Sequence, residues 1–188
     1  MYPEEGDLLR ITESELLQFG LYQGMELSDE LAAQLRAAGR ASELRARAAH
    51  MASSRMLSKK ELAERLTKKG AAAADAAAAA DWLEELGAVN DASYAGVIVR
   101  HYAAMGYGAG RVRQELQRRG VPRELWDAAL EELPDPADSI RSFIRSKLRD
   151  KPLDSVMSKR LTDALLRRGF RWSDIRPILS GLGQDIDE

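Results

Sequence analysis

Apolar and polar positions alternate along most of the chain with the spacing of a helix. From about residue 28 onward, apolar residues recur three and four positions apart, which places them on one helix face. One ten-residue pattern occurs three times, and we call residues 61–70, 111–120 and 160–169 the first, second and third copies. Each copy has two aliphatic residues four positions apart, two adjacent basic residues and a closing glycine. The closing glycines lie 50 and then 49 residues apart, a period typical of helical repeat proteins.

The repeated pattern predicts an all-α protein built from three tandem three-helix repeats, stacked as an elongated curved array. We expect these repeats at residues 41–91, 92–135 and 136–183. A lead-in with short helices, residues 1–40, precedes them, and an acidic tail, residues 184–188, follows. A single repeat cannot bury its apolar face alone, so stacking on neighbours supplies the core.

Helix-start signals place the first elements. Thr12–Glu15 and Ser58–Glu61 each have the spacing of a capping box, in which the hydroxyl and the carboxylate each accept a backbone N–H. Residues 7–11 are the one short segment that could be extended. Ser28 is a candidate N-cap for a helix that ends near Gly39, and a second helix is expected over residues 41–55.

An alanine-rich helix is expected over residues 72–86. Alanine favours the helix but buries little surface, so Trp82, Leu83 and Leu86 are expected to supply most of its packing. Low-complexity disorder is the alternative for this segment.

The second half of the chain is divided by glycine and proline. We call residues 106–110 the glycine-rich turn, and their glycines predict a flexible connection between helices. A helix is expected to run from Pro122 to residue 133, and its core stripe comprises Leu125, Ala129, Leu130 and Leu133. Ser173 is the expected N-cap of the last helix.

Composition narrows the class of protein. The chain has no cysteine, which excludes disulfides and thiolate chemistry. No run of apolar residues approaches the length of a membrane span, and we expect a soluble cytoplasmic protein.

The charge is unevenly distributed along the chain. The net charge is −2, yet residues 138–182 hold 11 Lys and Arg against 5 Asp and Glu. Such a basic end suits nucleic acid or an acidic protein surface, and a merely solvated surface is the alternative.

The sequence contains no catalytic constellation. It lacks both common phosphate-binding glycine motifs. The two histidines, His50 and His101, fall in different repeats, and each is expected to lie on a helix surface. We therefore expect no enzyme activity, no cofactor and no metal site.

The adjacent basic residues at the end of each copy have two explanations. They can compensate the negative end of the helix dipole, or they can form a ladder of cations that binds a repeating acidic partner. The candidate partner-binding residues comprise the three pairs and nearby cations: Lys68, Lys69, Arg111, Arg113, Arg118, Arg119, Arg141, Arg145, Lys147, Arg167 and Arg168.

The chain resembles the RecX family of recombination regulators over roughly residues 20–182. Residues 56–70 and 83–91 carry the resemblance in the first repeat, residues 108–120 in the second and residues 165–175 in the third. It departs from the family in the small alanines of residues 72–80 and in the few residues available for a leading β-hairpin. The resemblance implies a non-enzymatic monomer that binds the RecA recombinase filament, in its groove or at its growing end. It also implies restraint of filament assembly, ATP hydrolysis and strand exchange in DNA repair and the SOS response.

A nucleic-acid-binding helical repeat is the alternative function. Such a protein would affect recombination by competing for single-stranded DNA. Weak binding of single- or double-stranded DNA is compatible with either function, and salt dependence separates the two because phosphate contacts weaken steeply with salt.

Overall fold

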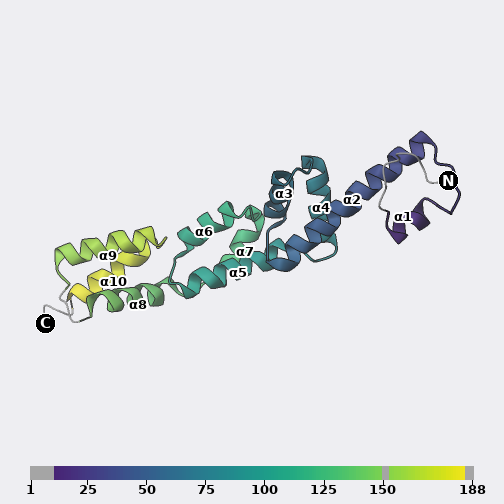
Figure 1. Ribbon diagram of the computed structural model, residues 1–188. Helices are drawn as coiled ribbons and strands as arrows, with labels where there is room; N and C mark the ends of the chain where they lie inside the picture. The colour runs from purple at the N-terminus through teal and green to yellow at the C-terminus, as the bar shows by residue number, and fades with distance from the viewer. Residues whose placement is uncertain (1–10, 150–152, 185–188) are drawn as a thin grey trace. The chain divides into compact units, whose positions relative to one another are not determined.

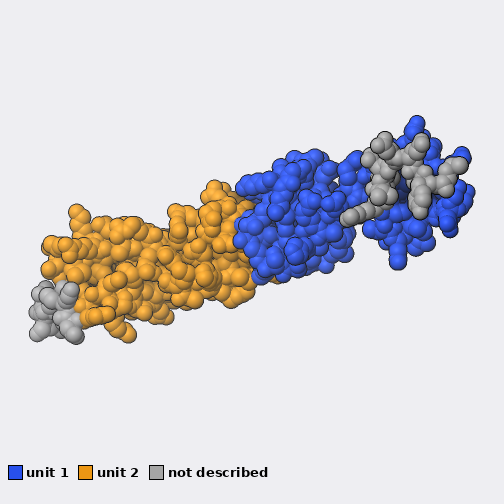
Figure 2. Space-filling model, viewed as in Figure 1, with its two compact units in different colours: residues 1–89 blue, residues 90–188 orange. Residues whose placement is uncertain are grey.

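The computed structural model describes residues 11–149 and 153–184. Every regular element in these ranges is helical, which confirms the all-α prediction. The first compact unit, residues 1–89, contains α1 (Glu13–Gln18), α2 (Asp29–Ser54), α3 (Lys59–Lys68) and α4 (Ala73–Glu85) (Figures 1 and 2). The second unit, residues 90–188, contains α5 (Asp91–Ala104), α6 (Ala109–Arg118), the 3-10 turn η1 (Arg123–Leu125), α7 (Trp126–Leu130), α8 (Pro136–Leu148), α9 (Ser155–Arg167) and α10 (Trp172–Gln184).

Side-chain caps begin the early helices where the sequence predicted them. The Thr12 hydroxyl accepts the Glu15 N–H at 3.2 Å, and the Glu15 carboxylate accepts the Thr12 N–H at 2.7 Å, so the first capping box is confirmed. Ser28 caps α2, and Ser58 accepts the Glu61 N–H at 3.0 Å at the start of α3. Of the expected extended segment, residues 7–10 lie outside the described residues.

The helix expected to end near Gly39 does not end there. Instead α2 runs without a break from Asp29 to Ser54, so the two helices expected here are one. A glycine inside a helix costs only about 1 kcal/mol relative to alanine. Good helix formers flank Gly39 on both sides, with Ala37 and Ala38 before it and Arg40 and Ala41 after it. Local propensity therefore outweighs the stop signal.

The first core joins α2, α3 and α4. Leu62 and Leu66 of α3 are fully buried in it, and burying each such leucine contributes about 1.5–3 kcal/mol. The alanine-rich segment is helical, but its packing differs from the prediction. Leu86 is 62% exposed, whereas Leu83 and three alanines (Ala76, Ala79 and Ala80) are buried. Small side chains let α4 approach α2 and α3 closely.

The second core and the third core lie in the second unit. Tyr94, Ile98, Val112, Leu116 and Ala129 belong to the second, which is formed by α5, α6 and α7. The third is formed by α8, α9 and α10, and its largest buried side chains are Ile140, Ile144, Leu165 and Ile175. The described residues therefore form three cores, but the chain divides into two compact units. The division into three repeats stays a prediction.

Two helix starts differ from those expected. Pro122 precedes the 3-10 turn η1, and α7 begins only at Trp126. Ala129 of the expected stripe is buried, and the three leucines of that stripe pack partly buried around it. The last helix begins at Trp172, so Ser173 lies inside it and is not its N-cap. The acidic tail beyond residue 184 lies outside the described residues.

Candidate partner-binding surface

The three copies of the motif have the same local ending. α3, α6 and α9 end at the basic pair, and the closing glycines Gly70, Gly120 and Gly169 all have positive φ. Positive φ suits glycine at a helix C-terminus. In each copy the backbone N–H of the second basic residue bonds back to the last helical turn. The pairs therefore lie at the negative end of a helix dipole, as the capping explanation requires.

Lys68 and Lys69 of the first copy are exposed. No ion pair joins either lysine to another described residue of this unit. A side chain built at Gly70 would meet nothing within 4 Å. The end of α3 therefore presents two exposed cations.

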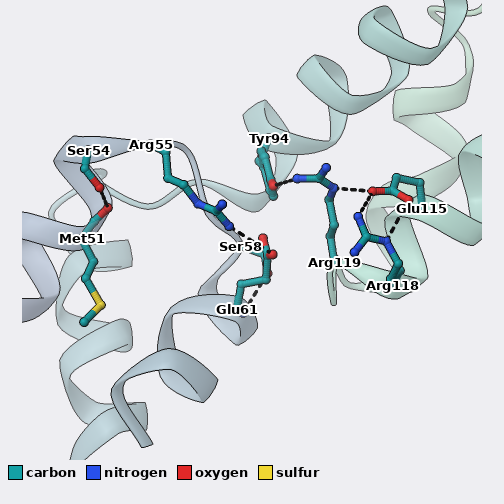
Figure 3. A network of polar contacts seen from close by, with 9 residues as sticks. All are labelled: Met51, Ser54, Arg55, Ser58, Glu61, Tyr94, Glu115, Arg118 and Arg119. Carbon is teal, nitrogen blue, oxygen red and sulfur yellow. Dashed lines mark hydrogen bonds and ion pairs between the residues drawn. The ribbon is translucent and has the colours of Figure 1, made fainter. Parts of the chain in front are cut away.

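In the second copy the basic pair surrounds a buried carboxylate (Figure 3). The Glu115 side chain is only 4% exposed, and it accepts a bidentate contact from Arg118 and a bond from Arg119 Nε at 2.6 Å. Arg119 also donates to the Tyr94 hydroxyl at 2.5 Å. The Arg118 side chain remains 67% exposed, whereas that of Arg119 is 29% exposed. Arg119 thus stabilises the second core, and Arg118 remains largely accessible.

The same contacts set the protonation of this cluster. Hydrogen bonds from Arg118, and then from Arg119, lower the pKa of the Glu115 carboxyl from 4.5 to about 2, against the opposing effect of burial. Burial acts to lower the pKa of Arg119, but its bonds to Glu115 and Tyr94 raise it overall. Glu115, Arg118 and Arg119 are therefore all charged at neutral pH.

In the third copy Arg168 bonds to other residues of the second unit. Its Nη1 donates to the carbonyl oxygens of Met105 and Gly106, each at 3.0 Å. The guanidinium also lies over two rings, 5.1 Å from the centre of Tyr107 and 4.7 Å from that of Phe143. Arg168 therefore ties the end of α9 to the end of α5 and to α8.

The glycine-rich turn is a packed joint, which corrects its interpretation as a flexible connection. The N–H groups of Gly108 and Gly110 donate to the carbonyls of Arg168 and Gly169, each at 2.9 Å. A Cβ at Gly108 would lie 2.7 Å from the Gly169 oxygen, and a Cβ at Gly169 would lie 2.1 Å from the Arg111 nitrogen. Only glycine permits this approach of two backbones. We call this contact the glycine joint.

The remaining candidates lie on three helices of the second unit, α6, α8 and α9. Arg111 is exposed on α6 and contacts Gln114 at 3.2 Å. Arg113 is partly buried and lines a cleft of about 380 Å³ with Phe170 and Asp174. Three further cations are exposed on α8, namely Arg141, Arg145 and Lys147. Arg167, the first member of the third pair, is exposed on α9.

Sequence reasoning missed the roles of Glu115 and Tyr94. A signal was present, because Glu115 occupies the position held by Arg65 in the first copy and by Ala164 in the third. An acid next to a buried leucine and three residues before a basic pair can bond to that pair. Nothing in the sequence indicated that Tyr94 would supply the second acceptor for Arg119.

Other site types are not found among the described residues. His50 and His101 are both exposed, as predicted. No group of three metal-ligating side chains occurs in residues 11–149 and 153–184. No helix in those ranges is long and apolar enough to cross a membrane.

Comparisons with known proteins converge on one family. Residues 90–130 match the model of the second three-helix domain of RecX. Regulatory protein RecX of Xanthomonas axonopodis pv. citri is 35% identical over 121 residues, covering 63% of this chain and 75% of that protein. Regulatory protein RecX of Lactobacillus delbrueckii subsp. bulgaricus is 28% identical over 186 residues, covering 95% of this chain and 68% of that protein. A crystal structure of regulatory protein RecX has a TM-score of 0.80 at 21% identity, covering 89% of this chain and 85% of that one.

Proposed function

The chain belongs to the RecX family of regulatory proteins, and from that membership we propose that it binds the RecA recombinase filament and restrains its assembly, ATP hydrolysis and strand exchange. The observation that carries the proposal is the 35% identity to a RecX regulatory protein over three quarters of that protein's length. The proposal describes a monomeric, cytoplasmic, non-enzymatic regulator.

Exposed cations supply the contacts in this proposal. Lys68, Arg118 and Arg167 are the first members of the three pairs, and all three are exposed. We assign partner contacts to them, to Lys69 and Arg111, and to the cations of α8. Arg119 and Arg168 have structural roles, and Arg113 is partly enclosed in its cleft, so these three contribute less. An acidic, repeating filament surface is a suitable partner for such a set.

The alternative is direct competition for single-stranded DNA, which the same exposed cations favour. The two mechanisms differ in their dependence on salt. Binding to a single strand weakens with a log–log slope of about −0.7 for each phosphate contact. The affinity of a protein–protein contact that also buries apolar surface depends less on salt concentration.

The test is the ATPase rate of RecA on single-stranded DNA, titrated with this protein. Direct DNA binding is measured in parallel at low and moderate salt. Inhibition at protein concentrations too low to coat the DNA would support the filament-directed mechanism. No effect on RecA, together with salt-sensitive DNA binding, would favour the alternative.

A further inference from the structure

A groove in the second unit combines an apolar floor with a basic rim. It lies between α8 and α10, the green and yellow helices of Figure 1, and has a volume of about 420 Å³. Five apolar residues form the floor: Ile144, Leu148, Pro177, Ile178 and Leu182. Three arginines line the same groove: Arg141, Arg145 and Arg149.

The arginines follow one another at every fourth position of the chain. Four residues of a helix rise about 6 Å, so Arg141 and Arg145 lie on one face of α8. Arg149 follows as the C-cap residue, with a φ of 45°. Arg141 contacts Asp138 at 3.5 Å, but both side chains are more than half exposed, so this pair holds Arg141 weakly. Arg145 and Arg149 form no ion pair with a described residue of the second unit.

No carboxylate of a described residue lines the groove. Among the described residues the rim is positive, with Arg141 only weakly paired to Asp138, and the floor keeps apolar surface accessible beside the charge. A phosphate backbone would satisfy the arginines but not the floor, whereas an acidic amphipathic helix would satisfy both. Carboxylates four residues apart on such a helix would have the same spacing of about 6 Å as the arginines.

We propose that the groove between α8 and α10 binds an acidic amphipathic helix of a partner protein. The carboxylates of that helix pair with Arg141, Arg145 and Arg149, and its apolar side chains cover the floor. This inference deepens the proposed function and rests on it for the statement that the partner is a protein. It adds a surface of mixed character to the exposed cations of the three motif copies.

The test uses the full chain and a fluorescein-labelled synthetic helical peptide. The peptide carries glutamate at every fourth position and leucine on the adjoining positions, and binding is followed by fluorescence anisotropy. Two comparison peptides replace the glutamates with glutamine or the leucines with serine. An oligodeoxythymidylate of similar charge is the nucleic-acid probe.

The protein variants separate a specific groove from a general charge effect. Arg141→Glu/Arg145→Glu reverses two rim charges, and Lys159→Glu/Arg160→Glu makes the same charge change at exposed positions of α9 outside the groove. We expect the rim variant to weaken binding of the acidic peptide at least tenfold and the α9 variant to change it less than twofold. Leu182→Ala, at the edge of the floor, should weaken binding severalfold. Circular dichroism confirms that each variant is folded.

Any one of four results would overturn the proposal. The first three are no binding of the acidic peptide, equal loss in the rim and α9 variants, and tighter rim-dependent binding of the oligonucleotide than of the peptide. The fourth is equal binding of the serine-substituted peptide, which would show that the floor has no role. The RecA ATPase titration is independent of these peptides, so failure of the groove and failure of the proposed function are distinguishable.

Discussion

The turn after α3 and the turn after α9 follow the same sequence pattern but have different surroundings. Each ends a helix with two basic residues and a glycine of positive φ. At the first turn, Lys69 is exposed and the space around Gly70 is open. At the second, Arg168 donates to two carbonyls and Gly169 touches the backbone of α6. A repeated motif thus sets the local turn, while its neighbours decide whether the cation faces solvent or the protein.

The largest difference between the two turns should appear when the glycines are replaced. Gly70→Ala places a Cβ in open space at positive φ, which should destabilise by about 1–2 kcal/mol. Gly169→Ala adds a clash with the backbone at Arg111, and overpacking of this kind costs about a further 1–3 kcal/mol. Urea denaturation of both variants measures the two losses. Equal losses would contradict the glycine joint.

The second copy sharpens the comparison because its pair holds a buried acid. The folded-state pKa of Glu115 is depressed, so its contribution to stability is present above about pH 4.5 and is lost as the pH falls toward about 2. Glu115→Gln should therefore lower the free energy of unfolding at pH 7 by at most about 3 kcal/mol. Its deficit should shrink in acid.

Denaturation of Glu115→Gln at about pH 7, 4.5 and 3 measures this dependence. Glu124→Gln, at an exposed position of the same unit, is the control and should change stability little at any pH. A deficit of Glu115→Gln that stayed constant across this pH range would show that the ion pairs do not contribute as described.

A smaller difference in stability loss is expected when the second basic residue of each turn, Arg168 or Lys69, is replaced. Arg168→Ala removes two charged hydrogen bonds and two ring contacts, and should destabilise the protein by about 2 kcal/mol. Lys69→Ala removes an exposed side chain and should cost less than about 0.5 kcal/mol. Thermal unfolding of the two variants gives the comparison. A larger loss in Lys69→Ala would reverse the roles assigned to the two turns.

Much of the fold could be predicted because its signals are local. Apolar spacing and side-chain caps at Thr12, Ser28 and Ser58 placed helix starts to within a residue or two. The helix end predicted near Gly39 was wrong, because a glycine ends a helix only when the surrounding residues do not favour continuing it. The burial of Ala76 and Ala80 could not be foreseen because it depends on how closely α4 approaches its neighbours.

The candidate site was less predictable, because a cation's use depends on distant residues. Arg119 bonds to Tyr94, 25 positions earlier, and Arg168 bonds to Met105, 63 positions earlier. Such contacts leave no periodic trace in the sequence. The sequence therefore identified which residues are cationic but not which of them face solvent.

Binding to the RecA filament by variants of the exposed cations tests the central claim most directly. Lys68→Gln/Arg118→Gln/Arg167→Gln neutralises the first, exposed residue of each pair, and Arg36→Gln/Arg123→Gln/Arg176→Gln makes the same charge change at other exposed positions. Both are measured with RecA filaments on single-stranded DNA, beside the unchanged protein. We expect the first variant to bind at least tenfold more weakly and the second to bind within about twofold of the unchanged protein. Equal binding by both folded variants would contradict the assignment of partner contacts to the basic pairs.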